Sequence, residues 1–160
     1  MTKYNEQNFL KDFIKRTLIN LEYIQQAEKQ GKEVYEVTQL VNSCLGLIVF
    51  LQQYGDGLIS DADICPSLLK DLQNSITKNT YKGKRKEQNF NNILYHLRNA
   101  ISHGKLYFEN EEHNGEMQIS CIEFTDVNDK QQQFVIKLNI KQIEKLAKYT
   151  IKISNYYDKK

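Results

Sequence analysis

Apolar residues recur every three or four positions along five stretches of the chain, a spacing that gives a helix one apolar face. We therefore expect helices over about residues 5–29, 34–53, 66–77, 87–103 and 140–156. The second of these stretches is apolar on more than one face, so it should lie at the centre of the fold. Gly104 suits the position just past the end of the fourth helix. Asn139 is expected to cap the last helix, with Gln142 reaching back to the cap.

Between the fourth and fifth expected helices the period of the pattern changes to two. Strands are expected over about residues 105–109, 117–125 and 132–138. Asn114–Gly115 and residues 126–129 carry turn-forming residues between them. The predicted fold class is mainly α: an antiparallel bundle of about five helices, with a small antiparallel β-sheet inserted before the last helix. We expect a single domain over residues 1–160.

Composition and charge narrow the class of protein. Lys plus Arg total 22 and Asp plus Glu total 20, so the net charge is +2 and by itself indicates no partner. Three cysteines without a close pair fit neither a disulfide framework nor a zinc site, and we expect no metal and no cofactor. The first residues are polar and no apolar run is long enough to span a bilayer. These features predict a cytoplasmic protein with no membrane partner.

The fourth expected helix carries two stripes. At about 100° per residue, one side is apolar and the opposite side carries Asn92, His96, Asn99 and His103. Arg98 and Ser102 lie on the flank between the stripes. A solvated helix face usually carries Lys and Glu, which favour helix, but the segment 88–103 contains no Lys, Glu or Asp. A solvated face and a functional face both remain open on the pattern alone.

The segment Arg98-Asn-Ala-Ile-Ser-His103 resembles the Arg-x4-His signature of the HEPN superfamily, whose helical bundle carries this motif on a late helix. The segment Val37–Phe50 resembles the second helix of a plasmid- and prophage-borne HEPN subfamily. Together the resemblance covers most of residues 34–104. HEPN toxins silenced by partner nucleotidyltransferases often carry Tyr two residues after the motif His. Here that position is Lys105 and the nearest tyrosine is Tyr107, which speaks against nucleotidylation of this chain.

This resemblance implies a metal-independent endoribonuclease, commonly a toxin or an antiviral defence effector, acting as a homodimer. His103 would be general base or acid, Arg98 would bind the scissile phosphate, and Asn99 would orient the imidazole or contact the phosphate. Cleavage by the 2′-hydroxyl needs a base, an acid and a cation. Since each motif has one histidine, which is base or acid at a given moment, two chains would have to share a composite site.

Further candidates surround the motif. The RNA-binding candidates fall into two groups. A basic segment contributes Tyr81, which could stack on a base, and Lys82, Lys84, Arg85 and Lys86. The fourth expected helix contributes His96 and Ser102. The alternative interpretation of the basic segment is a solvated loop, which is what most runs of charge in a sequence are. Thr38, Gln39 and Asn42 either pack polar groups between helices or line the cleft opposite the motif.

The expected partners are RNA, a second copy of the chain, and an antitoxin or regulatory protein. An alternative function is a non-catalytic HEPN module that binds RNA, a nucleotide or a protein partner. A third is a structural protein whose polar stripe only mediates dimerisation. The RNA target, the trigger, the role of the sheet and whether the nuclease is active are left open by the sequence.

Overall fold

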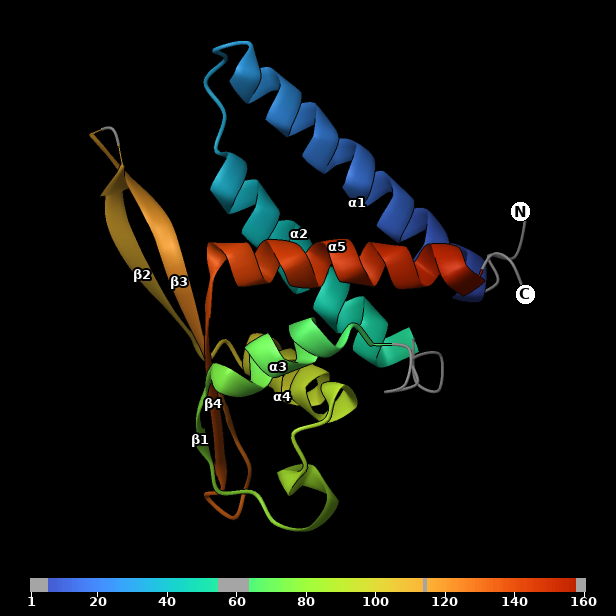
Figure 1. The fold of residues 1–160 in the computed structure, drawn as a ribbon, viewed down its shortest axis with the longest axis vertical. Coiled ribbons are helices and arrows are strands. Elements are labelled where there is room, and N and C mark those ends of the chain that lie inside the picture. The colour runs from blue at the N-terminus through green and yellow to red at the C-terminus, as the bar shows by residue number, and fades with distance from the viewer. Residues whose placement is uncertain (1–5, 55–63, 114, 158–160) are drawn as a thin grey trace.

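The computed structural model describes residues 6–54, 64–113 and 115–157 (Figure 1). Three helices come first in this part of the chain, and the strands follow together with two further helices. In order, the elements are α1 (Glu6–Lys29), α2 (Glu36–Tyr54), α3 (Pro66–Asn74), β1 (Ile76–Asn79), the 3-10 turn η2 (Gly83–Lys86), α4 (Phe90–Ser102), β2 (Leu106–His113), β3 (Glu116–Val127), β4 (Gln133–Asn139) and α5 (Ile140–Tyr157). No helix in the described ranges combines the length and apolar character needed to cross a membrane.

The strands form one antiparallel sheet in the order β1-β4-β3-β2. β2 and β3 form a long hairpin, and β4 pairs with β3 only from Cys121 to Val127. The hairpin therefore extends beyond β4, as Figure 1 shows. On the other edge, Ile76 and Asn79 of β1 pair with Ile136 and Phe134 of β4.

The sheet corrects the predicted fold class. The prediction of a small sheet inserted before the last helix is wrong. The sheet has four strands, and one of them, β1, comes from the chain before α4. This segment was predicted as the end of a helix and the start of a loop, but α3 ends at Asn74. The physical reason is long-range: β4 offers a free edge whose backbone groups need partners, and Ile76–Asn79 supplies them. The Ser75 carbonyl also accepts from the Lys137 N–H at 3.1 Å.

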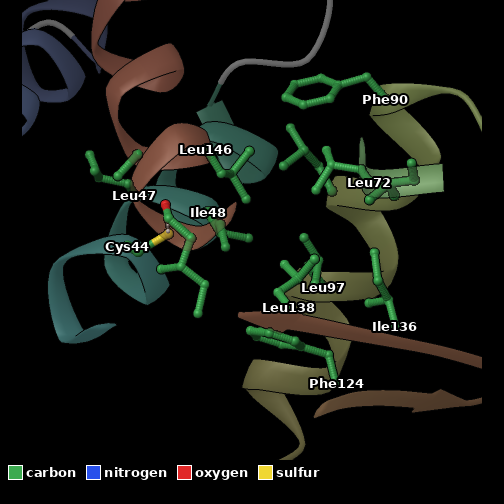
Figure 2. Close-up of a cluster of buried hydrophobic side chains, with 14 of the residues drawn as sticks. Cys44, Leu47, Ile48, Leu72, Phe90, Leu97, Phe124, Ile136, Leu138 and Leu146 are labelled. Atoms are coloured by element: carbon green, nitrogen blue, oxygen red, sulfur yellow. Dashed lines mark hydrogen bonds between the residues drawn. The ribbon is translucent and has the colours of Figure 1, made fainter. Parts of the chain in front are cut away.

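The core lies between the sheet and the helices. α2 contacts α1, α4, α5 and β3, so the prediction that the second helix is central is confirmed. The predicted apolar face of α4 is also confirmed, with Phe90, Ile93, Leu94 and Leu97 buried. Figure 2 shows side chains of α2, α4, α5 and the sheet meeting in this cluster. Its labelled members are Cys44, Leu47, Ile48, Leu72, Phe90, Leu97, Phe124, Ile136, Leu138 and Leu146.

Two predicted helix ends are confirmed. Asn139 Oδ1 accepts from the Gln142 N–H at 2.9 Å, and Gln142 Oε1 accepts from the Asn139 N–H at 3.0 Å, which is a capping box. After α4, Gly104 adopts φ +63°, and the Lys105 N–H returns to the Ala100 carbonyl at 2.9 Å. This left-handed residue ends α4 and directs the chain into β2.

Candidate nucleic-acid site on α4

The motif occupies the C-terminal end of α4. Arg98 and Asn99 are half-buried, whereas Ser102 and His103 are exposed. His103 is the C-cap residue, and its backbone N–H donates to the Asn99 carbonyl at 3.0 Å. The Arg98 guanidinium donates through Nη1 to Asn99 Oδ1 at 3.1 Å. The end of the helix therefore presents an exposed imidazole close in sequence to a guanidinium held by its neighbour.

Behind the motif, the Asp126 carboxylate at the end of β3 gathers polar groups from α4 and from the segment before η2. Its Oδ2 accepts from His96 Nδ1 at 2.7 Å, from the Tyr81 hydroxyl at 2.9 Å and from Asn99 Nδ2 at 3.4 Å. Asp126 is only 4 % exposed. A buried carboxylate is costly unless hydrogen-bonded donors surround it, and here three donors do so.

These contacts shift the ionisation of Asp126 and Tyr81. Burial favours a higher pKa for the Asp126 carboxyl, but the hydrogen bonds from His96, Tyr81 and Asn99 outweigh it and hold the pKa below its ordinary value. Burial and the hydrogen bond to Asp126 raise the pKa of the Tyr81 hydroxyl well above its ordinary value. Asp126 is therefore the ionised acceptor and Tyr81 the neutral donor at pH 7.

Two predicted RNA contacts are corrected by this arrangement. His96 is 1 % exposed and its ring stacks on Phe134 at 4.2 Å between ring centroids, while Tyr81 is 6 % exposed and its ring lies 4.5 Å from His96. The prediction that His96 and Tyr81 contact RNA directly is therefore wrong, because both side chains are buried. The helical spacing predicts His96 on the side of α4 away from the core, but the sheet and residues 81–87 cover that side, and His96 packs against the core residue Phe134.

The basic segment is fastened to the same side of α4. Asn92 Nδ2 donates to the carbonyls of Lys84 at 2.7 Å and Glu87 at 3.1 Å, and Asn92 Oδ1 accepts from Arg85 Nη1 at 2.9 Å. The Arg85 guanidinium also lies 3.7 Å from the centre of the Tyr95 ring.

Its charged side chains consequently differ in what they contact. The Arg85 guanidinium is engaged by α4. Lys82, Lys84 and Lys86 are exposed around it, in a segment whose backbone Asn92 holds. Arg85 is exposed too, but its guanidinium is already held by α4, so the three lysines are the basic candidates to which no such contact is assigned.

The predicted cleft residues lie on the first turns of α2. Thr38 and Asn42 are exposed, and Gln39 donates through Nε2 to Ser43 Oγ on the same helix at 3.4 Å. α2 packs against α4. That these residues line a cleft with Arg98 and His103 stays a prediction.

A groove of about 540 Å³ lies elsewhere, between the start of α2, the β2–β3 hairpin and the start of α5. Glu111, Glu112 and Lys141 are among its lining residues, and the lining includes none of the predicted site residues. Its two carboxylates make it a poor surface for a phosphate backbone.

Asp126 is a residue of this site that the sequence pattern does not single out, because residues 126–129 are rich in turn-forming side chains. A signal was present: Ile122 and Phe124 alternate on the buried face of β3, and Asp126 continues that face by the same period of two. An acidic residue at the next buried position of a strand needs donors nearby, and His96 on the polar stripe was a candidate.

Comparison with known proteins agrees with the motif. The family model described as HEPN pEK499 p136 matches residues 1–160. Searches of curated proteins and of solved structures found no match. HEPN domains are associated with functions involving nucleotides or RNA, and often with ribonuclease toxins. By a match that spans its whole length, this chain belongs to the HEPN pEK499 p136 family.

Proposed function

We propose that this HEPN protein is a metal-independent endoribonuclease whose site is shared by two copies of the chain. The observation that carries the proposal is the open end of α4. There His103 is exposed, and Arg98 is held by Asn99 one residue away. The other histidine of the helix, His96, is buried against Asp126 and is unavailable to a substrate. His103 is thus the one histidine of α4 that RNA can reach.

The reaction needs only groups of this kind. The 2′-oxygen attacks the adjacent phosphorus, the bond from phosphorus to the 5′-oxygen breaks, and the products are a 2′,3′-cyclic phosphate and a free 5′-hydroxyl. One imidazole takes the proton of the 2′-hydroxyl and another gives a proton to the leaving oxygen. The Arg98 guanidinium, a planar fork of donors, stabilises the charge on the pentavalent phosphorus. Because each chain offers one exposed α4 histidine, two copies supply the pair.

The exposed lysines support an RNA substrate. Lys82 is the N-cap residue of η2, and Lys84 and Lys86 lie within it, just before α4, in a segment held to the helix by Asn92. Contacts of such lysines with phosphates steer a polyanion and weaken as salt is added. A toxin or defence effector of this class also requires an antitoxin or another regulatory protein to restrain it in its own cell.

The test is cleavage of RNA by purified protein in EDTA. We expect products ending in a 2′,3′-cyclic phosphate, and no cleavage where the attacking nucleotide is 2′-deoxy. Arg98→Ala and His103→Ala should each abolish cleavage, while His113→Ala, the same change at the histidine outside α4, should not. Cleavage that persists in the Arg98 and His103 variants, or at a deoxy position, would disprove the mechanism. RNA retained without turnover by the wild type would favour the non-catalytic binding module.

The shared site has its own test. Specific activity should fall when the protein is diluted below the concentration at which it dimerises, as measured by analytical ultracentrifugation. A monomeric protein with constant specific activity would contradict the shared site.

A further inference from the structure

Asp126 joins the motif to the sheet through one amide. Its Oδ2 accepts from Asn99 Nδ2 at 3.4 Å, and Asn99 Oδ1 accepts from Arg98 Nη1 at 3.1 Å. The three residues thus form a chain from carboxylate to amide to guanidinium, although Asp126 lies on β3 and the other two on α4. The proposed cleavage uses the guanidinium but gives the carboxylate no role.

The carboxylate selects one orientation of the Asn99 amide. An asparagine has one donor end and one acceptor end. With Nδ2 turned to the carboxylate, Oδ1 necessarily turns away from it, towards Arg98. The opposite orientation would place Oδ1 against Asp126 Oδ2, two acceptors facing each other. It would also place the amide NH2 group against the guanidinium, two donors facing each other. Arg98 therefore finds a hydrogen-bond acceptor beside it because Asp126 is behind Asn99.

Asp126 is itself firmly placed. It stands opposite Phe134 in the pairing of β3 with β4, and the Phe134 ring stacks on His96. His96 Nδ1 and the Tyr81 hydroxyl donate to its Oδ2 from the side chains packed around it. A group held by a sheet and by two buried donors is a rigid reference point for a half-exposed arginine.

We propose that Asp126 is a positioning residue for the ribonuclease motif: through Asn99 it fixes where the Arg98 guanidinium lies. The inference rests on the proposed function for its effect on cleavage, but the placing of the Arg98 side chain can be measured without any activity. Asp126 itself touches no RNA, since it is buried beneath α4 and the segment before η2.

The first test is nuclear magnetic resonance of the full chain labelled with 15N. In Asp126→Asn, the side-chain amide signals of Asn99 and the guanidinium signal of Arg98 should shift. Asp126→Glu keeps the charge but moves the carboxylate by one methylene, and it should shift the same signals by a different amount. Asp129→Asn is the matched control: it makes the same substitution at an exposed position three residues on and should leave both signals unchanged. Unchanged Asn99 and Arg98 signals in a folded Asp126 variant would overturn the proposal.

The second test is a double-mutant cycle on RNA cleavage. We expect Asp126→Asn to lower kcat by roughly tenfold to a hundredfold, with a smaller change in KM. If Asp126 acts through Asn99, the double variant with Asn99→Ala should be no slower than Asn99→Ala alone. Multiplying losses would show that Asp126 acts independently of Asn99, and would overturn the proposal.

The two tests separate the two claims. Absence of cleavage by the wild type would refute the proposed function, and the spectra would still decide whether Asp126 orients Asn99 and Arg98. If the wild type cleaves RNA, losses that multiply in the double variant, or Asn99 and Arg98 signals that do not shift, would refute the positioning role alone.

Discussion

The two ends of the polar stripe on α4 carry similar residues but meet different surroundings. At the N-terminal end, Asn92 and His96 are buried and hydrogen-bonded to residues 81–87 and to Asp126. At the C-terminal end, Asn99 is half-buried and His103 is exposed. The amide and the imidazole of the first pair hold the fold together, whereas those of the second pair are partly or fully open to solvent. Residue type and helical spacing alone do not distinguish a buried, packing histidine from an exposed one.

Asn99 is where the two ends meet. Its side-chain amide touches both the buried carboxylate and the half-buried Arg98 guanidinium. The buried end therefore does more than stabilise the helix: it supplies a fixed support for the open end. Substitutions at the two ends should accordingly have different effects on the free energy of unfolding. Substitutions that act through Asn99 should have similar effects on the proposed RNA cleavage.

The largest expected difference is between the two histidines. His96→Ala removes the closest donor to Asp126 and leaves a cavity beside Phe134, so we expect a loss of about 3 kcal/mol in the free energy of unfolding. His103→Ala, at an exposed position, should change it by less than about 0.5 kcal/mol. Urea unfolding measures both. His96→Asn, which keeps a donor near the position of Nδ1, should recover part of the loss, and equal stabilities of the two alanine variants would contradict the comparison.

The contribution of the buried end to the free energy of unfolding should also depend on pH. Because folding lowers the pKa of Asp126, its carboxylate stabilises the protein fully above the unfolded value of about 3.9, and this stabilisation is lost as the pH falls through the folded pKa. Urea unfolding between pH 6 and the acid limit of folding should therefore show a gap between wild type and Asp126→Asn that is widest at pH 6 and shrinks below the unfolded pKa. A gap independent of pH would contradict the assignment of an ionised Asp126.

The two asparagines make a smaller comparison. Asn92→Ala removes the contacts with the Lys84 and Glu87 carbonyls and with Arg85, so a loss of about 1–2 kcal/mol is expected. Hydrogen exchange of residues 82–87 should accelerate in this variant. Asn99→Ala should cost less stability and leave exchange in that segment unchanged. Faster exchange in both variants would show that the segment depends on the whole stripe.

Local features of this fold were accessible from the sequence. The stripe ending at Ile101 placed the core face of α4, and the cap of α5 was predictable because Asn139 and Gln142 lie three residues apart. Short-range geometry decides such features, and the chain carries it in its spacing.

Long-range features were not accessible. β1 contains a single strongly apolar residue, Ile76, and exists because β4 lies beside it more than fifty residues later in the chain. In the candidate site, helical spacing places His96 and Asn99 on one side of α4. It could not show that Asp126 and residues 81–87 cover His96, or that Asp126 also reaches Asn99. Removing the positive charges of the segment that covers His96 tests what that segment contributes to RNA binding.

The smallest expected effect on stability is at the three exposed lysines at the N-cap of η2 and within it. Replacing Lys82, Lys84 and Lys86 together by Gln should change the free energy of unfolding by less than about 0.5 kcal/mol, because none of the three side chains is buried. The same triple change should reduce the salt dependence of RNA affinity: at about 0.7 per phosphate contact with single strands, the slope of log K against log salt should fall by about 2.

Fluorescence titration of a labelled single-stranded RNA at several salt concentrations measures that slope, in the His103→Ala background so that RNA is not cut. The matched control is Gln at three exposed lysines of α1 and the turn after it, Lys15, Lys29 and Lys32, which makes the same change in net charge. If both triple variants lower the slope equally, net charge alone attracts the RNA. If only the η2 variant lowers it, the segment that Asn92 fastens to α4 is the RNA-binding surface, and the covered end of the stripe contributes to function by holding it there.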